Sequence, residues 1–419
     1  MMVAPDVDRT SLQRHTVRTL SAAQVLAGVG VGAGVAAGSL LVADVTGSDS
    51  WAGLAQTSGV IGAAVAAVPL ARLSSARGRR TGLVSGLLVA GVGAAVVVAG
   101  AVLGSLLLLL AGMLTVGVAS AVTLQARYAA TDLAEPRHTA RALSVVVWAT
   151  TVGAVLGPNL MQPAAGLAAR ISLPDLAGPY LLTGSALLGA ALVIAAGLRR
   201  DPLLTARRLR DEHVAPPHVA LSSALRTVAA SAGAVLGMAA LVLGHAVMVM
   251  VMVMVMTPVH MQHVDVTLTV IGLVISVHIL GMYALSPVVG ALGDRFGPRS
   301  VIAAGGVILV TATVVAGTAA GTSVARLGVG LFLLGLGWSC TLIAGSALLT
   351  SSVAAVDRPA VQGAGDTLMN VGAAAAGALA GVVVAVGSYG WLNVLAGLLV
   401  VPLVVGVGWE RRRPTPVAL

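Results

Sequence analysis

The sequence predicts an all-α integral membrane protein with twelve transmembrane helices in two pseudo-symmetric halves of six. Three observations carry this prediction. Of the 419 residues, 58% are hydrophobic and only 9% are charged, and the apolar residues form runs long enough to cross a bilayer. A soluble domain carries about 25% charged residues, so this composition cannot cover a water-facing surface. We therefore expect the lipid bilayer to surround most of the chain.

Each predicted helix corresponds to an apolar run of about 20 residues, the length that crosses the hydrocarbon core. Backbone polar groups in lipid must be bonded within their own segment, so long apolar runs are helical. The predicted spans are residues 18–43, 52–71, 81–103, 105–127, 141–163, 178–198, 227–257, 266–291, 299–321, 324–349, 361–386 and 389–408.

The arginines predict the orientation. The formal charge of +9 comes entirely from arginine, because the chain has no lysine. In a soluble protein this excess would suggest nucleic acid, but here the arginines cluster between apolar runs, as in cytoplasmic loops. With the N-terminus inside, only Arg170 and Arg326 fall on the outer side. We expect a multi-pass protein of the bacterial plasma membrane with both termini cytoplasmic, and no nucleic-acid partner.

The longest polar stretch divides the chain into its two halves. The predicted boundaries are 1–198 for the first half, 199–220 for a cytoplasmic linker and 221–419 for the second half. This layout is typical of transporters that bind a solute between two related halves near the bilayer midplane. Walker, HExxH, CxxC and nucleophile-elbow motifs are absent, so we expect no enzyme activity and no resident cofactor. We also expect a monomer.

Two loops at equivalent places in the halves repeat each other. ARLSSARGRR at 71–80 and GALGDRFGPR at 290–299 align on Gly78 and Gly297. They resemble the G-x-x-x-D-R-x-G-R-R loop of the major facilitator superfamily, which implies that fold, alternating access and a cytoplasmic gate held by the loop charges. The first copy departs from the motif because Ser75 replaces the aspartate. The matching residues are Gly290, Asp294, Arg295, Gly297 and Arg299 in the second loop, and Gly78, Arg79 and Arg80 in the first.

Methionine is unevenly distributed, with eight of the thirteen between residues 238 and 282. Methionine usually fills gaps in apolar cores. Thioether and imidazole are also suitable ligands for Cu(I). The side chains of His278 and Met282, spaced i and i+4, can point to one site. Met252 shares a helix face with Met256 and His245. We rank these three residues lower as candidate metal ligands.

The segments MVMVMVMTP and HILGMY resemble the CcoA-type bacterial copper importers of the same superfamily. Those proteins carry Met-x-x-x-Met before Thr-Pro on the seventh helix and His-x-x-x-Met on the eighth. The resemblance implies a copper pathway through Met250, Met254, His278 and Met282. It departs in having three extra methionines on the seventh helix.

Charged residues within the membrane are functional candidates. Asp366, with Asn370 one turn on, is a candidate proton or substrate site, and a hydrated carboxylate near a helix end is an equal alternative. Arg127 is expected to be a gate or interface contact. An alternative function is therefore a proton-coupled exporter of a small organic compound, which the partial exporter motif GAVLGPNL at 153–160 also favours. A third possible function is that of a non-transporting receptor or scaffold with the same fold.

Overall fold

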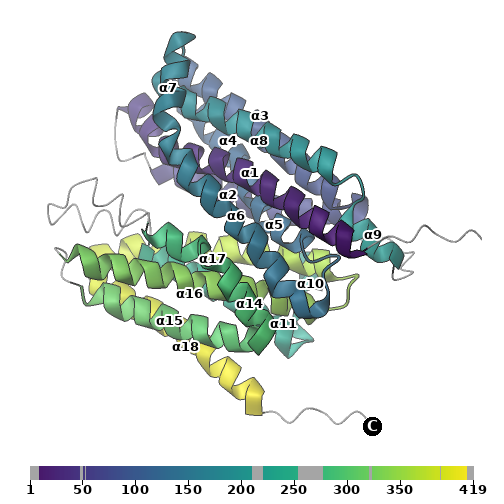
Figure 1. The fold of residues 1–419 in the computed structure, drawn as a ribbon. Helices are drawn as coiled ribbons and strands as arrows, with labels where there is room; N and C mark the ends of the chain where they lie inside the picture. Colours follow the sequence, from purple (N-terminus) through teal and green to yellow (C-terminus); the bar gives the residue numbers. More distant parts are fainter. Residues whose placement is uncertain are drawn as a thin grey trace, which may run out of the picture. The chain divides into compact units, whose positions relative to one another are not determined.

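The chain divides into two compact units, Met1–Val219 and Ala220–Leu419. The computed structural model describes residues 9–47, 51, 53–209, 220–252, 277–319, 323–386 and 388–412. The division falls at the end of the segment that was predicted to be a linker. All regular structure in the described residues is helical (Figure 1).

The first unit is a bundle in which the long helix α1 packs on α6 and α8, and α3 packs on α4 and α8. Most of these helices begin within a few residues of a predicted span. Its α-helices are α1 (Arg9–Thr46), α2 (Gly53–Arg77), α3 (Arg79–Leu103), α4 (Leu106–Val116), α5 (Val118–Ala129), α6 (Thr139–Asn159), α7 (Met161–Arg170), α8 (Gly178–Gly197) and α9 (Pro202–Leu209). Two short 3₁₀ turns, η2 (Pro136–His138) and η3 (Asp175–Ala177), precede α6 and α8.

The second unit is organised around α16, which packs on both α11 and α15, while α18 packs on α15 and α11. A helical segment at 277–283 leads through two turn residues into α14. The elements are α10 (Leu221–Ala229), α11 (Ala232–Met252), α14 (Ser286–Phe296), α15 (Pro298–Gly317), α16 (Val324–Ser351), α17 (Arg358–Val386) and α18 (Tyr389–Arg412).

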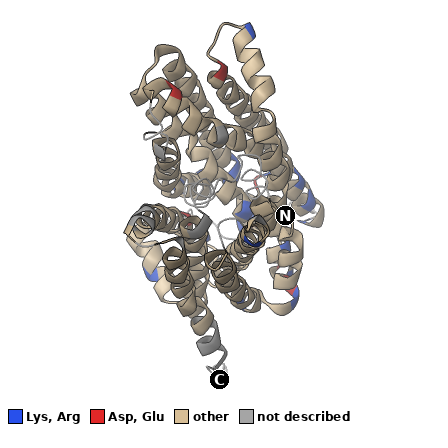
Figure 2. Cartoon of the chain, turned by 90° about the vertical axis from the view of Figure 1, so that its left-hand side faces the viewer, with Lys and Arg blue, Asp and Glu red and all other residues tan. Residues whose placement is uncertain are grey.

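Ten helical stretches among the described residues are long and apolar enough to cross a membrane. α17 and α18 occupy the remaining two predicted spans. Charged residues are sparse along the helices, as Figure 2 shows. Two predicted spans are interrupted: the fourth is α4 and α5, which meet at Gly117, and the fifth ends at Asn159, directly after Pro158.

Helices α1 and α6 approach each other through glycine. A methyl group on Gly153 would clash with the carbonyl oxygen of Val25 and lie 2.7 Å from the Cα of Gly28. One turn further, a methyl group on Gly157 would lie 2.6 Å from the carbonyl oxygen of Val29. The glycines of GAVLGPNL therefore have a structural explanation, a close helix contact, that needs no exporter function.

We expect Gly153→Ala to destabilise the protein by about 1–3 kcal/mol, because the added methyl group overpacks a backbone contact. The thermal unfolding midpoint in detergent measures this effect. Gly166→Ala is the matched control, since a methyl group there meets no atom within 4 Å. Equal midpoints for the two variants would contradict the packing argument.

Candidate functional site

The two repeated loops share one backbone conformation. Gly78, between α2 and α3, has φ 92° and ψ 162°, and Gly297, between α14 and α15, has φ 82° and ψ 149°. Side chains with a Cβ atom rarely adopt this region, which explains glycine at both positions. The alignment of the two loops on these glycines is therefore supported by geometry as well as by sequence.

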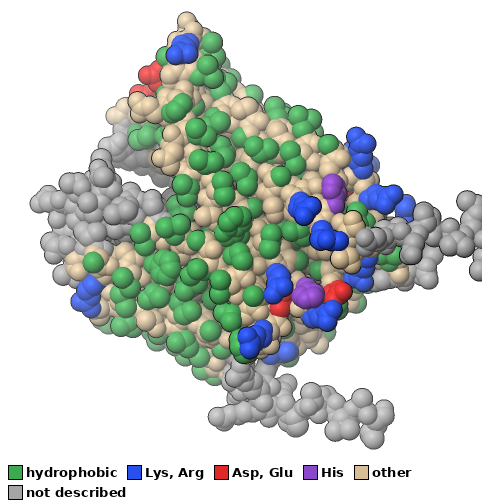
Figure 3. Space-filling model, viewed as in Figure 1, with side chains coloured by type: hydrophobic (Ala, Val, Ile, Leu, Met, Phe, Trp, Pro, Cys, Tyr) green, Lys and Arg blue, Asp and Glu red, His purple; other side chains and the backbone are tan. Residues whose placement is uncertain are grey.

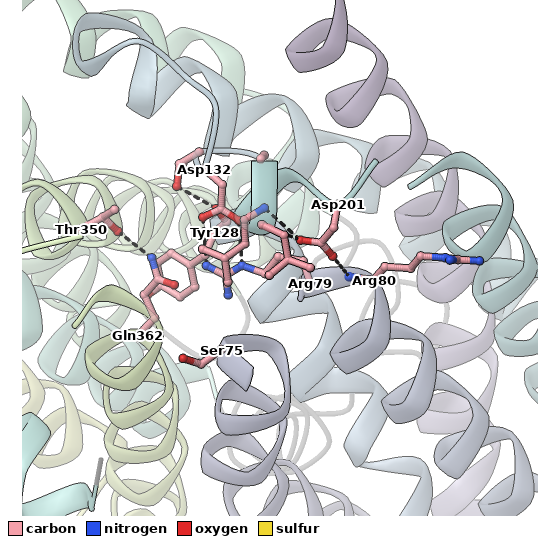
Figure 4. Close-up of polar contacts among 12 residues, drawn as sticks. Ser75, Arg79, Arg80, Tyr128, Asp132, Asp201, Thr350 and Gln362 are labelled. Carbon is pink, nitrogen blue, oxygen red and sulfur yellow. Dashed lines mark hydrogen bonds and ion pairs between the residues drawn. The ribbon is translucent and has the colours of Figure 1, made fainter. Parts of the chain in front are cut away.

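Arg79 in the first loop is held by a buried ion pair. Its Nε and Nη2 atoms donate to Asp132 Oδ2 and Oδ1 at 2.9 and 3.2 Å, and the exposed fractions of the two side chains are 1% and 6% (Figure 4). Planar two-point pairing of this kind is the strongest that arginine makes. The pair fastens the start of α3 to the segment that follows α5.

Asp201 supplies a carboxylate to the first loop, which the sequence motif does not predict. It accepts hydrogen bonds from the backbone amides of Arg80, Leu203 and Leu204, so it joins the first turn of α3 to the first turn of α9. Its Oδ2 lies 2.5 Å from where a Cβ on Gly78 would be, so only glycine leaves room for it. Figure 4 shows Asp201 beside Arg79 and Arg80.

Ser75, which stands where the motif has aspartate, contacts the same short helix. Arg207 of α9 donates to the Ser75 carbonyl oxygen at 2.7 Å and to Ser75 Oγ at 3.3 Å. The first loop therefore has a carboxylate, Asp201, and an arginine, Arg207, that come from beyond α8. In the sequence, the replacement of the motif's aspartate by Ser75 is the signal that the first loop differs from the second.

The second loop keeps the motif's charged residues. Gly290 is buried in α14, and the guanidinium of Arg295 lies 5.2 Å from the centre of the Phe296 ring. Arg299 Nη2 lies 3.2 Å from where a Cβ on Gly233 would be, so it reaches the start of α11. Asp294, in the last turn of α14, also interacts within the described structure.

Arg127 lies in α5 and is buried, with 1% of its surface exposed. It donates to the Leu124 carbonyl oxygen at 2.7 Å and to the Tyr128 hydroxyl at 3.1 Å, and its guanidinium lies 4.4 Å from the Tyr128 ring centre. Its predicted role as a gate or interface contact stays a prediction.

His278 is buried against α16. Its Nδ1 atom lies 2.7 Å from the carbonyl oxygen of Leu331, and because a carbonyl only accepts, Nδ1 carries the proton. Nε2 then bears the lone pair of the neutral ring, and it has no hydrogen-bond partner among the described residues. Gly281 and Gly335 allow the two backbones to approach at this level.

The predicted methionines are separated by their surroundings. Met282 is half-buried one turn after His278. Met250 is 3% exposed in an apolar cluster with Leu309, Leu331 and Leu392 of α15, α16 and α18. Its burial is therefore accounted for by packing. Met252 ends α11, and Met254 and Met256 lie outside the described residues.

His245 belongs to a cluster that the sequence did not reveal. The indole Nε1 of Trp338 donates to His245 Nδ1 at 2.8 Å, and the Tyr283 ring meets the Trp338 ring edge-on with centres 5.6 Å apart. These aromatic groups join α11, α16 and the segment that carries Met282. Cys340, which follows closely in α16, packs against Gly305.

Asp366 is fully buried in α17 of the second unit. The Nδ2 atom of Asn370 donates to the Asp366 carbonyl oxygen at 2.8 Å, and Gln362 Nε2 donates to Thr350 Oγ1 at 3.2 Å. Asp366 thus lies in a buried polar row on α17, and its role as a proton or substrate site stays a prediction.

We expect Asp132→Asn to destabilise the protein by about 3–5 kcal/mol, because it leaves the buried Arg79 charge opposite a neutral amide. Unfolding in detergent measures this. The double variant Arg79→Met/Asp132→Leu should lose less stability than Asp132→Asn alone. Glu135→Gln, an exposed carboxylate nearby, is the control and should stay within about 0.5 kcal/mol of wild type. An Asp132→Asn protein as stable as wild type would refute the ion pair's role.

Comparisons with known proteins agree with this architecture. The sequence matches the Major Facilitator Superfamily over residues 20–264 and 240–418. It is 39% identical to the uncharacterized MFS-type transporter YdeG of Bacillus subtilis (strain 168) over 403 residues, 96% of this chain and 93% of that one. It is 29% identical to the riboflavin transporter RfnT of Brucella anthropi over 352 residues, 82% of this chain and 84% of that one.

Solved structures show the same fold. The outward-facing transporter FucP matches with a TM-score of 0.70 and 17% identity, over 95% of this chain and 99% of that one. A bacterial homologue of the iron transporter ferroportin, also outward-facing, matches with a TM-score of 0.74 and 13% identity, over 95% and 100% of the two chains. The predicted all-helical membrane fold is confirmed, and these relatives are transporters rather than enzymes. The chain therefore belongs to the Major Facilitator Superfamily of multi-pass membrane transporters.

Proposed function

We propose that this secondary transporter imports Cu(I), and that His278 and Met282 bind the ion along its path. The observation that carries the proposal is the hydrogen bond from His278 Nδ1 to the Leu331 carbonyl, which leaves the Nε2 lone pair for a ligand. Histidines that bind metals commonly make this kind of contact through the other ring nitrogen, since it fixes tautomer and orientation.

Met282 supports the same proposal by its position. It lies four residues after His278 on one helical segment, so its thioether can approach the same point as the imidazole. A neutral imidazole and a neutral thioether suit a soft monovalent ion, and they hold it without fixed negative charge. Such a site can release the ion when the protein changes conformation. Met250 and Met254 are retained from the sequence resemblance, with Met250 as the weaker of the two because packing explains its burial.

We expect His278→Asn to reduce uptake of Cu(I) into proteoliposomes by at least about tenfold. Asparagine can still donate to the Leu331 carbonyl through Nδ2, but it has no counterpart of Nε2. Met282→Leu should show a similar loss. Met113→Leu, a buried thioether in the first unit, is the matched control and should transport at the wild-type rate. Radioactive copper kept reduced with ascorbate gives the measurement. If His278→Asn took up Cu(I) at the wild-type rate, the assignment of copper as the substrate would be wrong.

The alternative is a proton-coupled exporter of a small organic compound, favoured by the burial of Asp366. A carboxyl group inside the membrane can take up and release a proton as access alternates. The relationship to RfnT makes riboflavin a reasonable member of the solute panel for this alternative.

For the exporter, Asp366→Asn should abolish solute flux driven by a proton gradient, because the amide stays neutral at every pH. Asp44→Asn, at an exposed carboxylate near the end of α1, is the control and should retain flux. Flux assays with a metal panel and an organic panel separate the two functions. Proton-driven flux that survives in Asp366→Asn would remove Asp366 from the coupling mechanism.

A further inference from the structure

The first unit contains a basic cavity of about 360 Å³ at the end where α1 begins. It lies between α1, the segment before η2 and the start of α6. Over the first unit, Figure 3 shows arginine and histidine side chains gathered towards this end of the visible face. The charged and imidazole side chains that line the cavity are Arg9, Arg14, Arg18, Glu135, His138 and Arg141.

The cavity lies where the apolar part of the helices ends. α1 has 38 residues. At 1.5 Å per residue it is about 57 Å long, whereas the hydrocarbon core is about 30 Å thick. Its apolar run starts near Leu20, so the turns at 9–18 extend beyond the core. α6 likewise becomes apolar from Ala142 onwards. Both helices therefore carry their arginines at the level of lipid headgroups, on the side predicted to be cytoplasmic.

The arginines are arranged to meet an anion from two sides. Arg14 and Arg18 are exposed and lie one turn apart on α1, and Arg141 faces the same cavity from α6. Arg9 closes one end, donating to the carbonyl oxygens of Leu133 and Ala134 at 2.9 and 3.1 Å. Guanidinium groups that share a cavity repel one another, so a bound phosphate would relieve an unfavourable interaction and accept several hydrogen bonds.

Among the described residues, Glu135 is the one carboxylate that lines the cavity, and Arg137 and His138 lie beside it. Arg137 Nε donates to Glu135 Oε2 at 2.8 Å, and His138 Nδ1 lies 3.5 Å from the same oxygen. The hydrogen bond from Arg137 lowers the pKa of the Glu135 carboxyl, so it is ionised at neutral pH. The described side chains of the lining thus include four arginines, Arg9, Arg14, Arg18 and Arg141, and one carboxylate.

Gln13 is a further polar residue of the cavity lining. Its Nε2 atom donates to the Ala130 carbonyl oxygen at 2.7 Å, which fixes the direction of the amide. Its Oε1 atom is buried and has no hydrogen-bond partner among the described residues. The walls beside it are apolar, formed by Val17, Leu133 and Val145.

We propose that this cavity binds a glycerol phosphate group, carried by an anionic phospholipid such as phosphatidylglycerol. The arginines bind the phosphate, and the glycerol group lies beside Gln13 in the cavity lining. The apolar walls contact the first carbons of the lipid. Basic pockets between membrane helices on the cytoplasmic side bind anionic headgroups in this way. The site is independent of the transported substrate.

Binding is tested with the purified full-length protein, by the rise in its unfolding midpoint on adding phosphatidylglycerol or phosphatidylcholine. Phosphatidylglycerol should stabilise the wild type more, and Arg14→Gln/Arg18→Gln should weaken its apparent affinity by about tenfold or more. Arg199→Gln/Arg200→Gln removes the same charge from exposed positions outside the cavity lining, and it should keep the wild-type response. The unfolding midpoints without added lipid show that both variants fold.

A second arm adds inorganic phosphate and glycerol 3-phosphate without acyl chains. A lipid site predicts that neither ion reproduces the effect of phosphatidylglycerol at matched concentration. Equal stabilisation by a free phosphate would overturn the lipid assignment, and equal loss in the two double variants would overturn the cavity as the binding site. A wild type that does not distinguish phosphatidylglycerol from phosphatidylcholine would refute the proposal altogether.

Discussion

Apolar helices in a bilayer gain little from hiding apolar surface from one another, because the lipid is equally apolar. They associate through close van der Waals contact, and this requirement shapes both units. Gly153 allows α1 and α6 to approach closely in the first unit. Gly335 allows the same close approach between α16 and the segment that carries His278 in the second unit. The backbone of His278 takes part in that second contact, and its ring is hydrogen-bonded to Leu331 of α16. A larger residue at either glycine would separate the backbones and move the side chains between them.

The few charges of the chain follow a complementary rule, since a buried charge is tolerated only where another group compensates it. Arg79 and Asp132 meet this condition within one unit, and Asp201 completes the arrangement from α9. At the membrane boundary the rule relaxes. There Arg14 and Arg18 are exposed on α1, and the compensating charge we infer comes from lipid instead of protein.

The fold could be predicted from the sequence because membrane spans are local: length and apolarity of one segment suffice. The partner of Arg79 could not, since Asp132 is 53 residues away and nothing in either segment indicates the pairing. The contact of Asp201 with the first loop is harder still to predict. Asp201 lies 121 residues after Arg80, and it supplies a carboxylate to a loop whose motif aspartate is replaced by Ser75. Met250 fitted a copper motif by spacing, yet spacing does not tell which way a helix faces. The structure packs that side chain among leucines.

The docking of α9 has a practical meaning for work on the isolated halves. By composition the polar stretch from 199 onwards is a linker, and dividing the chain at residue 199 would separate the two predicted halves. The carboxylate of Asp201 and the guanidinium of Arg207 nevertheless complete the loop around Ser75 and Arg80. α9 is thus a part of the first half that is encoded after its last membrane helix. A split transporter that is to reassemble from two polypeptides should be divided after Leu209, so that the first fragment keeps its own loop intact.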